Sequence, residues 1–196
     1  MSESKSIMIV GVGGQGSLLA SRILGNVLLS QGYDVKVSEV HGMSQRGGSV
    51  VTYVKYSEDK VYSPIVELGE ADAIISFEVL EAARYVSYLK KGGKIIVSDQ
   101  QIDPMPVITG AAQYPADIVK KIRDKGIHIL DLDALRLAKE AGNAKAANVV
   151  LMGALSNIMD FDEQVWLDAV RACVPQKFLE LNLKAFDLGR KAHFAE

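Results

Sequence analysis

The sequence has little cysteine, and this limits the chemistry that the chain can carry alone. Its 196 residues include a single cysteine, Cys173. One thiol cannot form an internal disulfide or a cysteine zinc site, and iron–sulfur clusters are usually held by several thiolates. We therefore expect a reduced, cytoplasmic protein that binds no cofactor by itself, so that any redox cluster lies on a partner chain.

The sequence also lacks an excess of charge and any long apolar run. It has 22 basic and 24 acidic residues and a formal net charge of −2, so nothing in its charge would attract nucleic acid or an anionic lipid surface. The apolar run at 7–10 ends at Gly11, and no segment approaches the roughly 20 apolar residues that cross a bilayer. We expect no nucleic acid and no membrane as a partner, and one globular domain over residues 1–196.

The hydrophobic pattern alternates between strands and helices before it becomes purely helical. It predicts strands at 7–10, 34–40, 50–56, 73–77, 94–98 and 127–132. It predicts helices from Gly14 to Gly32 and at 78–89, 117–125 and 134–141, followed by three helical segments at 146–159, 162–173 and 176–193. Segment 103–109, with Pro104 and Pro106, is expected to be extended at a sheet edge.

The connection between the second and third predicted strands decides the topology. Residues 41–49 are too few for a parallel crossover, which usually needs a dozen or more residues and a helix. The two strands should therefore be antiparallel neighbours. The expected fold is a three-layer, Rossmann-like α/β domain with a mixed sheet and a helical C-terminal third.

A glycine-rich turn follows the first predicted strand and precedes the first helix. It reads GVGGQG and comprises Gly11, Gly13, Gly14, Gln15 and Gly16, with Val12 between them. Such glycines allow a tight turn, and the free N–H groups and dipole of the following helix favour a phosphate. The motif predicts a cofactor-binding turn. The alternative is that the glycines only let the helix pack closely on the sheet.

A dinucleotide such as NAD would need an acid near the end of the second strand, roughly 20 residues beyond the motif. Glu39 stands at about that spacing. In a dinucleotide domain, however, the second strand leads into a crossover helix, whereas here it leads into a glycine-rich loop and an antiparallel strand. NAD binding therefore remains the minor interpretation.

That loop is the second candidate site. It contains His41, Gln45, Arg46, Gly47 and Gly48. Arginine offers a rigid fork of donors and glycine lets backbone N–H groups converge, so the loop could bind an anionic group beside the glycine turn. The alternative is a hairpin whose arginine is a surface or interface charge. No metal site is expected, and no catalytic acid, base or nucleophile can be assigned.

The opening segment resembles a known family. It reads IMIVGVGGQGSLLASRILGNVLLSQGYDVKVSEVHGMSQRGGSVVTYVKYS and is similar to the gamma-type domain of the 2-oxoacid:ferredoxin oxidoreductases. The resemblance continues more diffusely through 72–76 and 148–155. The loop wording SEVHGMSQRGGSV is most similar to the small (beta) subunit of the two-subunit indolepyruvate ferredoxin oxidoreductases.

The resemblance implies a complex that oxidatively decarboxylates an arylpyruvate, passes electrons to ferredoxin and delivers the acyl group to coenzyme A. It places thiamine diphosphate and the iron–sulfur clusters on a large (alpha) subunit and makes this chain a non-autonomous subunit of an oxidoreductase. Coenzyme A could then contact the glycine turn and Arg46 at the subunit interface. The alternative from another class is a self-sufficient module that binds NAD or coenzyme A, or a regulatory protein.

Overall fold

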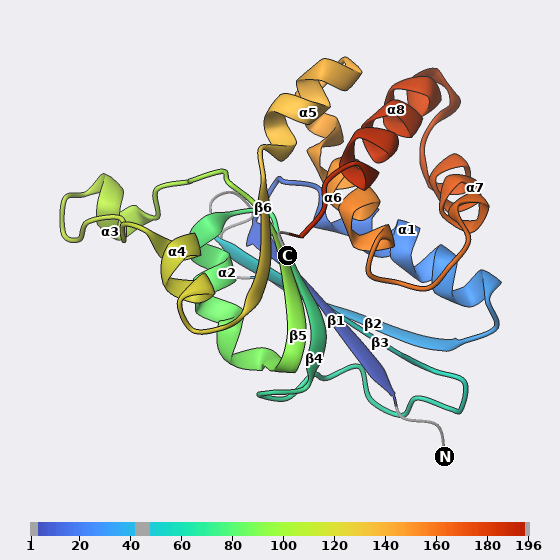
Figure 1. Ribbon diagram of the computed structural model, residues 1–196, viewed down its shortest axis with the longest axis horizontal. Helices are drawn as coiled ribbons and strands as arrows, with labels where there is room; N and C mark the ends of the chain where they lie inside the picture. Colours follow the sequence, from blue (N-terminus) through green and yellow to red (C-terminus); the bar gives the residue numbers. More distant parts are fainter. Residues whose placement is uncertain (1–3, 42–47, 195–196) are drawn as a thin grey trace.

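The computed structural model describes residues 4–41 and 48–194, which form a mixed sheet covered by helices (Figure 1). The sheet strands are β1 (Lys5–Val12), β2 (Asp34–His41), β3 (Ser49–Ser57), β4 (Ala71–Ser76), β5 (Leu89–Ser98) and β6 (His128–Leu132). The α-helices are α1 (Ser17–Ser30), α2 (Val79–Tyr85), α3 (Met105–Ile108), α4 (Ile118–Arg123), α5 (Ala134–Ala141), α6 (Ala147–Ser156), α7 (Glu163–Cys173) and α8 (Leu179–Arg190). Short 3-10 helices are η1 (Val86–Tyr88), η2 (Ala144–Ala146) and η3 (Gln176–Phe178).

The six strands lie in the order β2-β3-β1-β4-β5-β6. Strands β1, β4, β5 and β6 are parallel neighbours, whereas β3 is antiparallel both to β1 and to β2. The predicted antiparallel pair of second and third strands is confirmed. Because β3 separates β2 from β1, the carboxyl end of β2 does not lie beside β1 as it would in a dinucleotide-binding domain.

Two hydrophobic cores cover the two faces of the sheet, which gives three layers. In β1, Ile7 and Ile9 face the larger core with α1, α6, α7 and α8, and Met8 and Val10 face the smaller core with α2 and α4. Figure 1 shows these two groups of helices on opposite sides of the sheet. A strand buried on both faces is apolar throughout, as is usual for a parallel sheet. The predicted three-layer α/β fold with a helical C-terminal third is confirmed.

Helix α6 lies at the centre of the larger core. It is apolar around nearly its whole circumference, and every residue from Asn148 to Ser156 is buried. Helix α8 crosses it where Gly153 and Gly189 bring the two backbones into close contact. Helix α6 connects the C-terminal helices to the sheet, and its first turn contacts the glycine turn after β1.

Two predicted elements differ from the structure. Segment 103–109 is not a strand at the sheet edge, because it forms the short helix α3 with Pro104 as its N-cap and Pro106 in its first turn. Proline is compatible with a first helical turn, whose N–H groups have no partner within the helix. The helix predicted at 78–89 ends at Tyr85, and β5 already begins at Leu89. The remaining predicted elements are present, most of them with shifted ends.

Within residues 4–41 and 48–194, no helix is both long enough and apolar enough to cross a bilayer.

Candidate functional site

The glycine turn joins β1 to α1 at the carboxyl edge of the parallel strands. Gly14 and Gly16 have φ angles of 99° and 90°, a region that glycine adopts without steric cost. At Gly16 a β-carbon would also lie 2.6 Å from the side-chain nitrogen of Asn148. The Asn148 Nδ2 donates a hydrogen bond to the Gly16 carbonyl oxygen at 3.2 Å. The turn is thus shaped by close packing against α6.

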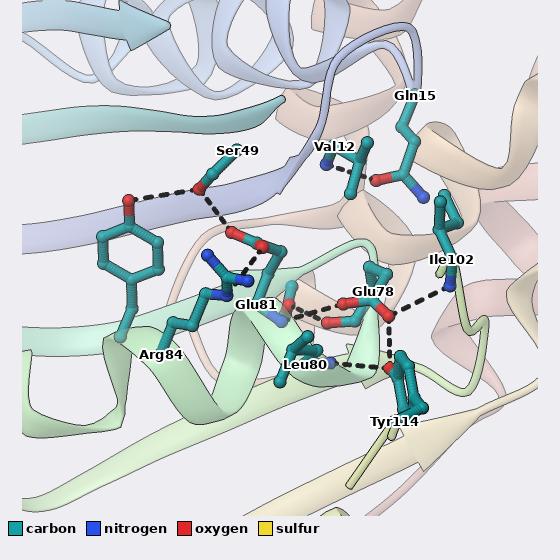
Figure 2. Close-up of polar contacts among 11 residues, drawn as sticks. Val12, Gln15, Ser49, Glu78, Leu80, Glu81, Arg84, Ile102 and Tyr114 are labelled. Carbon is teal, nitrogen blue, oxygen red and sulfur yellow. Dashed lines mark hydrogen bonds and ion pairs between the residues drawn. The ribbon is translucent and has the colours of Figure 1, made fainter. Parts of the chain in front are cut away.

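Gln15 ties the turn to the ends of the neighbouring strands. The Val12 N–H donates to its Oε1 at 2.7 Å, as Figure 2 shows, and its Nε2 donates to the Phe77 carbonyl at 2.9 Å and to Gln100 Oε1 at 3.0 Å. The side-chain amide therefore bonds to groups around three strand ends. Gln15 shapes the candidate site by fixing the turn, and its amide is already occupied within the protein.

The amino end of α1 offers unused hydrogen-bond donors. The helix has 14 residues and no side chain caps its first turn. The N–H groups of Gly14, Gly16 and Ser17 have no hydrogen-bond partner among the described residues. Because the helix dipole is also positive at this end, the turn presents an environment that stabilises an anion.

Two cavities flank the turn, and their charges differ. The first, which we call the lysine cavity, has a volume of about 480 Å³ and lies between the turn and α5–α6, with Lys145 as the charged group in its lining. The second, the glutamate cavity, has a volume of about 360 Å³ and lies between the turn and the end of β2. The lysine cavity is lined by Gly14, Gln15, Gly16, Phe77, Ser98, Gln100, Leu135, Ala144, Lys145, Ala147 and Leu151, and the glutamate cavity by Gly13, Gly14, Gly16, Ser17, Leu18, Glu39, His41 and Val50.

The glutamate cavity is the poorer site for an anion. The Glu39 Oε2 in its wall accepts hydrogen bonds from Ser17 Oγ at 3.4 Å and from Thr52 Oγ1 at 3.1 Å. A second negative charge placed there would be repelled by this carboxylate. In the lysine cavity the ammonium of Lys145 forms no ion pair with a described carboxylate. An anion bound at the turn therefore lies most favourably on the Lys145 side.

The structure brings the predicted turn and the ends of the predicted loop together. The Gly13 N–H donates to the Gly48 carbonyl at 2.9 Å, and His41 lies in the wall of the glutamate cavity. Gln45, Arg46 and Gly47 lie outside the described residues, so their role at the site remains a prediction. The turn and the two described ends of the loop thus lie together at the carboxyl edge, where α/β sheets bind ligands.

The residue that follows the loop is anchored to a buried carboxylate on α2. Ser49 Oγ donates to Glu81 Oε2 at 2.5 Å and lies 3.3 Å from the Tyr85 hydroxyl, and Arg84 Nε lies 3.3 Å from Glu81 Oε1 (Figure 2). Burial raises the pKa of Glu81, and the charge of Glu78 raises it further, while the Ser49 and Arg84 contacts oppose the shift. These contacts hold the first residue of β3 to α2.

Glu78 is a second buried carboxylate, only 1% exposed, at the amino end of α2. Its Oε2 accepts the Glu81 N–H at 2.8 Å, and its Oε1 accepts the Ile102 N–H at 3.1 Å and the Tyr114 hydroxyl (Figure 2). Burial raises the pKa of Tyr114, as does the Glu78 carboxylate. A buried charge is tolerated when donors surround it. Glu78 holds α2 and the connection after β5 together.

Sequence reasoning did not assign Lys145, Ser49, Glu78 or Glu81 to the site. Acidic residues are favoured at the amino end of a helix, so a glutamate just after a strand and at the start of a helix could have indicated Glu78. Asn148 is an asparagine in an otherwise apolar helix, a pattern that indicates a buried polar contact but does not identify its partner. Lys145 has no local signal, because its position beside the turn depends on how α5 and α6 pack.

The fold and the turn define a three-layer α/β domain with an anion-favouring glycine turn, in which an antiparallel strand replaces the second crossover of a dinucleotide-binding domain. The chain belongs to the pyruvate ferredoxin/flavodoxin oxidoreductase family, whose sequence model matches residues 6–192. It is 49% identical over 193 residues to indolepyruvate oxidoreductase subunit IorB of Thermococcus kodakarensis, with 95% of both chains covered. The family resemblance of the opening segment is confirmed.

Two solved structures share this fold. The gamma subunit of a keto/oxoacid ferredoxin oxidoreductase from Geobacter sulfurreducens aligns with a TM-score of 0.69 and 25% identity, covering 94% of this chain and 95% of that one. The pyruvate oxidoreductase subunit PORC of Thermotoga maritima aligns with a TM-score of 0.75 and 17% identity, covering 99% of both chains. The alignment thus extends over nearly the whole chain in each case.

Proposed function

We propose that this chain is the small subunit of an oxidoreductase that decarboxylates indolepyruvate or a similar arylpyruvate and passes the electrons to ferredoxin. The observation that carries the proposal is the 49% identity to an indolepyruvate oxidoreductase subunit across 95% of both chains. The family assignment supports the broader class, an oxidoreductase acting on 2-oxoacids. The chain then works as one part of a cytoplasmic complex.

The proposal divides the chemistry between two chains. Thiamine diphosphate and the iron–sulfur clusters belong to the large subunit, since the single Cys173 of this chain could not bind a cluster of the usual kind. Ferredoxin then docks on the assembled complex. What this chain contributes is a folded surface at the carboxyl edge of its sheet, and none of its described residues is assigned as a catalytic acid, base or nucleophile.

The glycine turn has a specific role in this proposal, which is to receive the phosphates of coenzyme A at the subunit interface. Three unpartnered N–H groups at Gly14, Gly16 and Ser17 fit an anionic oxygen cluster, and Lys145 supplies a positive charge on the same side. Arg46 adds a second cation from the loop. These residues bind and orient the thioester-forming substrate, and the thiol chemistry takes place on the partner.

A self-sufficient NAD-binding module is less well supported. Glu39, the candidate ribose ligand, already accepts hydrogen bonds from Ser17 and Thr52. Strand β3 also separates β2 from β1, so the usual dinucleotide crevice is absent from the described part of the sheet.

The decisive experiment is affinity purification of the tagged chain from its native cells, followed by an assay of dye reduction that depends on a 2-oxoacid. We expect a much larger chain with bound thiamine diphosphate and iron–sulfur absorbance, and higher activity with indolepyruvate than with pyruvate or 2-oxoglutarate. The isolated chain should be inactive. Absence of the partner or of 2-oxoacid activity would contradict the proposal, as would micromolar binding of NAD to the isolated chain in calorimetry.

A further inference from the structure

A further cavity lies at the opposite edge of the sheet from the glycine turn. Its volume is about 430 Å³, and it opens at the amino ends of β1, β4 and β5, beneath the connection between α6 and α7. We call it the amino-edge cavity. The proposed function uses only the carboxyl edge, so nothing in that proposal accounts for this second site.

The walls of the amino-edge cavity are aromatic. The rings of Tyr33 and Tyr56 meet at a centroid distance of 5.2 Å and an angle of 85°, and Phe161 lies 6.0 Å from Tyr33 at 66°. These are edge-to-face arrangements, the geometry that aromatic rings prefer. Ile158 and Met159 complete the apolar side of the wall. A planar aromatic ring is the group that such a wall accommodates best.

A hydroxyl without a hydrogen-bond partner among the described residues also lines this cavity. Tyr56 is only 5% exposed, yet its phenol oxygen forms no hydrogen bond with any described residue. Because this hydroxyl faces the cavity, a ligand that offers an acceptor can form a hydrogen bond with it. Burial raises the pKa of Tyr56, and the charge of Asp72 raises it further, so the phenol keeps its proton and acts as a donor.

The charges around the cavity favour an anion. Three lysines and two aspartates lie in the lining. Of the aspartates, Asp72 is already engaged, because it accepts the Ser6 N–H at 2.7 Å and pairs with Lys90. Lys94 lies over the ring of Phe194 at 5.4 Å, and neither Lys94 nor Lys5 forms an ion pair with a described carboxylate. The ammonium groups of Lys5 and Lys94 can therefore face an anionic ligand. Asp160 is the negatively charged residue of the lining that would repel it.

We propose that the amino-edge cavity binds a small aromatic carboxylate. The ring of the ligand lies against Tyr33, Tyr56 and Phe161, and its carboxylate accepts the Tyr56 hydroxyl and faces Lys5 and Lys94. The proposal is independent of the function proposed for the carboxyl edge, since the two sites share no lining residue.

Titration of the full chain with phenylacetate tests the proposal, by calorimetry and by chemical-shift changes of the backbone amides. We expect a dissociation constant of about 0.1–1 mM, which suits a ligand of this size. Cyclohexylacetate, which has the charge but no aromatic ring, and 2-phenylethanol, which has the ring but no charge, should both bind at least about fivefold more weakly. Shifts should centre on the amides around Tyr56.

Three variants make the test specific. Tyr56→Phe removes only the hydroxyl and should weaken phenylacetate binding about tenfold, and Lys94→Met should weaken it by a similar factor. The matched control Tyr62→Phe changes a tyrosine that is 86% exposed and outside the cavity, and should leave binding unchanged. Thermal melting verifies that each variant is folded. No binding up to about 10 mM phenylacetate, or unchanged affinity of folded Tyr56→Phe, would overturn the proposal.

Discussion

Asn148 and Gly16, 132 positions apart in the sequence, are fitted to each other. The amide nitrogen of Asn148 donates to the Gly16 carbonyl oxygen at 3.2 Å and lies 2.6 Å from the place where a β-carbon of residue 16 would stand. The Oδ1 of the same side chain accepts the Val149 N–H at 2.9 Å. The glycine turn after β1 therefore depends on the first turn of α6 for its shape.

Gly16→Ala should lower the free energy of unfolding by about 2–4 kcal/mol, because the new methyl group meets both a left-handed backbone and the Asn148 amide. Gly14→Ala is the matched control. Its φ angle is similar, at 99°, but a β-carbon there has no neighbour within 4 Å, so only the backbone strain of about 1–2 kcal/mol applies. Urea unfolding followed by the fluorescence of the buried Trp166, the only tryptophan, measures both variants. Equal losses of unfolding free energy in Gly16→Ala and Gly14→Ala would contradict the close contact between residue 16 and Asn148.

The same contact predicts coupling between two substitutions. Asn148→Ala alone should cost about 1 kcal/mol through its lost hydrogen bonds, but in the Gly16→Ala background it also removes the clash. The double variant should therefore be more stable than the sum of the single effects implies, by at least about 0.5 kcal/mol. Strict additivity in urea unfolding would show that the residues act independently.

The hydrogen bond between Ser49 and Glu81 predicts a cost for removing the Ser49 hydroxyl. Ser49→Ala leaves the buried Glu81 carboxylate without its short hydrogen bond and should destabilise the chain by about 1–3 kcal/mol. Ser49→Thr keeps the hydroxyl in a strand position that favours β-branched residues, and should recover most of the loss. Chemical unfolding of the two variants at one pH separates the hydroxyl from the size of the side chain. Wild-type stability of Ser49→Ala would show that the contact contributes nothing.

The raised pKa of Glu81 predicts how the free energy of unfolding depends on pH. Burial raises its pKa above the ordinary value of 4.5, so the folded chain holds this proton to a higher pH than the unfolded chain does. The stabilisation is fully present below about pH 4.5 and is lost as the pH rises through the folded pKa. Glu78 and Arg84, the charged groups that face Glu81, oppose each other in this shift.

Glu81→Gln should remove that decline, since glutamine cannot titrate while its side-chain oxygen still accepts the Ser49 hydroxyl. The free energy of unfolding of the variant, relative to that of the wild-type chain, should rise across the window above pH 4.5 and then level off. Glu58→Gln, a substitution of an exposed glutamate in the β3–β4 connection, is the control and should follow the wild-type profile. If the free energy of unfolding varied with pH in the same way for Glu81→Gln and the wild-type chain, the raised pKa of Glu81 would be contradicted.

Local sequence signals were sufficient for most of the fold. The short span at 41–49 left no room for a crossover helix, so the antiparallel pairing of β2 and β3 could be predicted before their place in the sheet was known. The order β2-β3-β1 could not, because it depends on which edges meet in space. Pro104 and Pro106 misled the prediction, since prolines suit both an edge strand and a first helical turn.

The candidate site, too, could be predicted from the sequence only in part. The GVGGQG turn could be predicted because its four glycines lie within six consecutive residues, between a strand and a helix. Lys145 and Asn148 reach the turn only through the packing of α6 on the sheet, a contact between segments more than 120 residues apart. A single sequence carries no local signal of such a contact. The difference in charge between the two flanking cavities could likewise be recognised only from the position of Glu39 in the structure.

Arg46 can be tested although it lies outside the described residues. Arg46→Ala should leave unfolding nearly unchanged and weaken either assembly with the large subunit or the use of coenzyme A. Arg46→Lys, which keeps the charge but not the planar fork, should recover only part of the loss. Steady-state kinetics and co-purification of the reconstituted complex measure both effects. Unchanged kinetics and assembly would make the arginine a surface charge.

The position of Lys145 predicts on which side of the glycine turn the phosphates of coenzyme A bind. Lys145→Gln should raise the KM of the complex for coenzyme A about fivefold at low salt, with little change in kcat, because an exposed ammonium contributes only about 1 kcal/mol to binding a phosphate. The effect should shrink as salt is added. Lys125→Gln, which removes an exposed lysine from the turn between α4 and β6, is the matched control and should leave KM unchanged. The opposite cavity gives the complementary test, since Glu39→Gln removes a negative charge and should not raise KM. If Glu39→Gln rather than Lys145→Gln impaired coenzyme A use, the ligand would lie on the β2 side of the turn, and the assignment of the two cavities would be reversed.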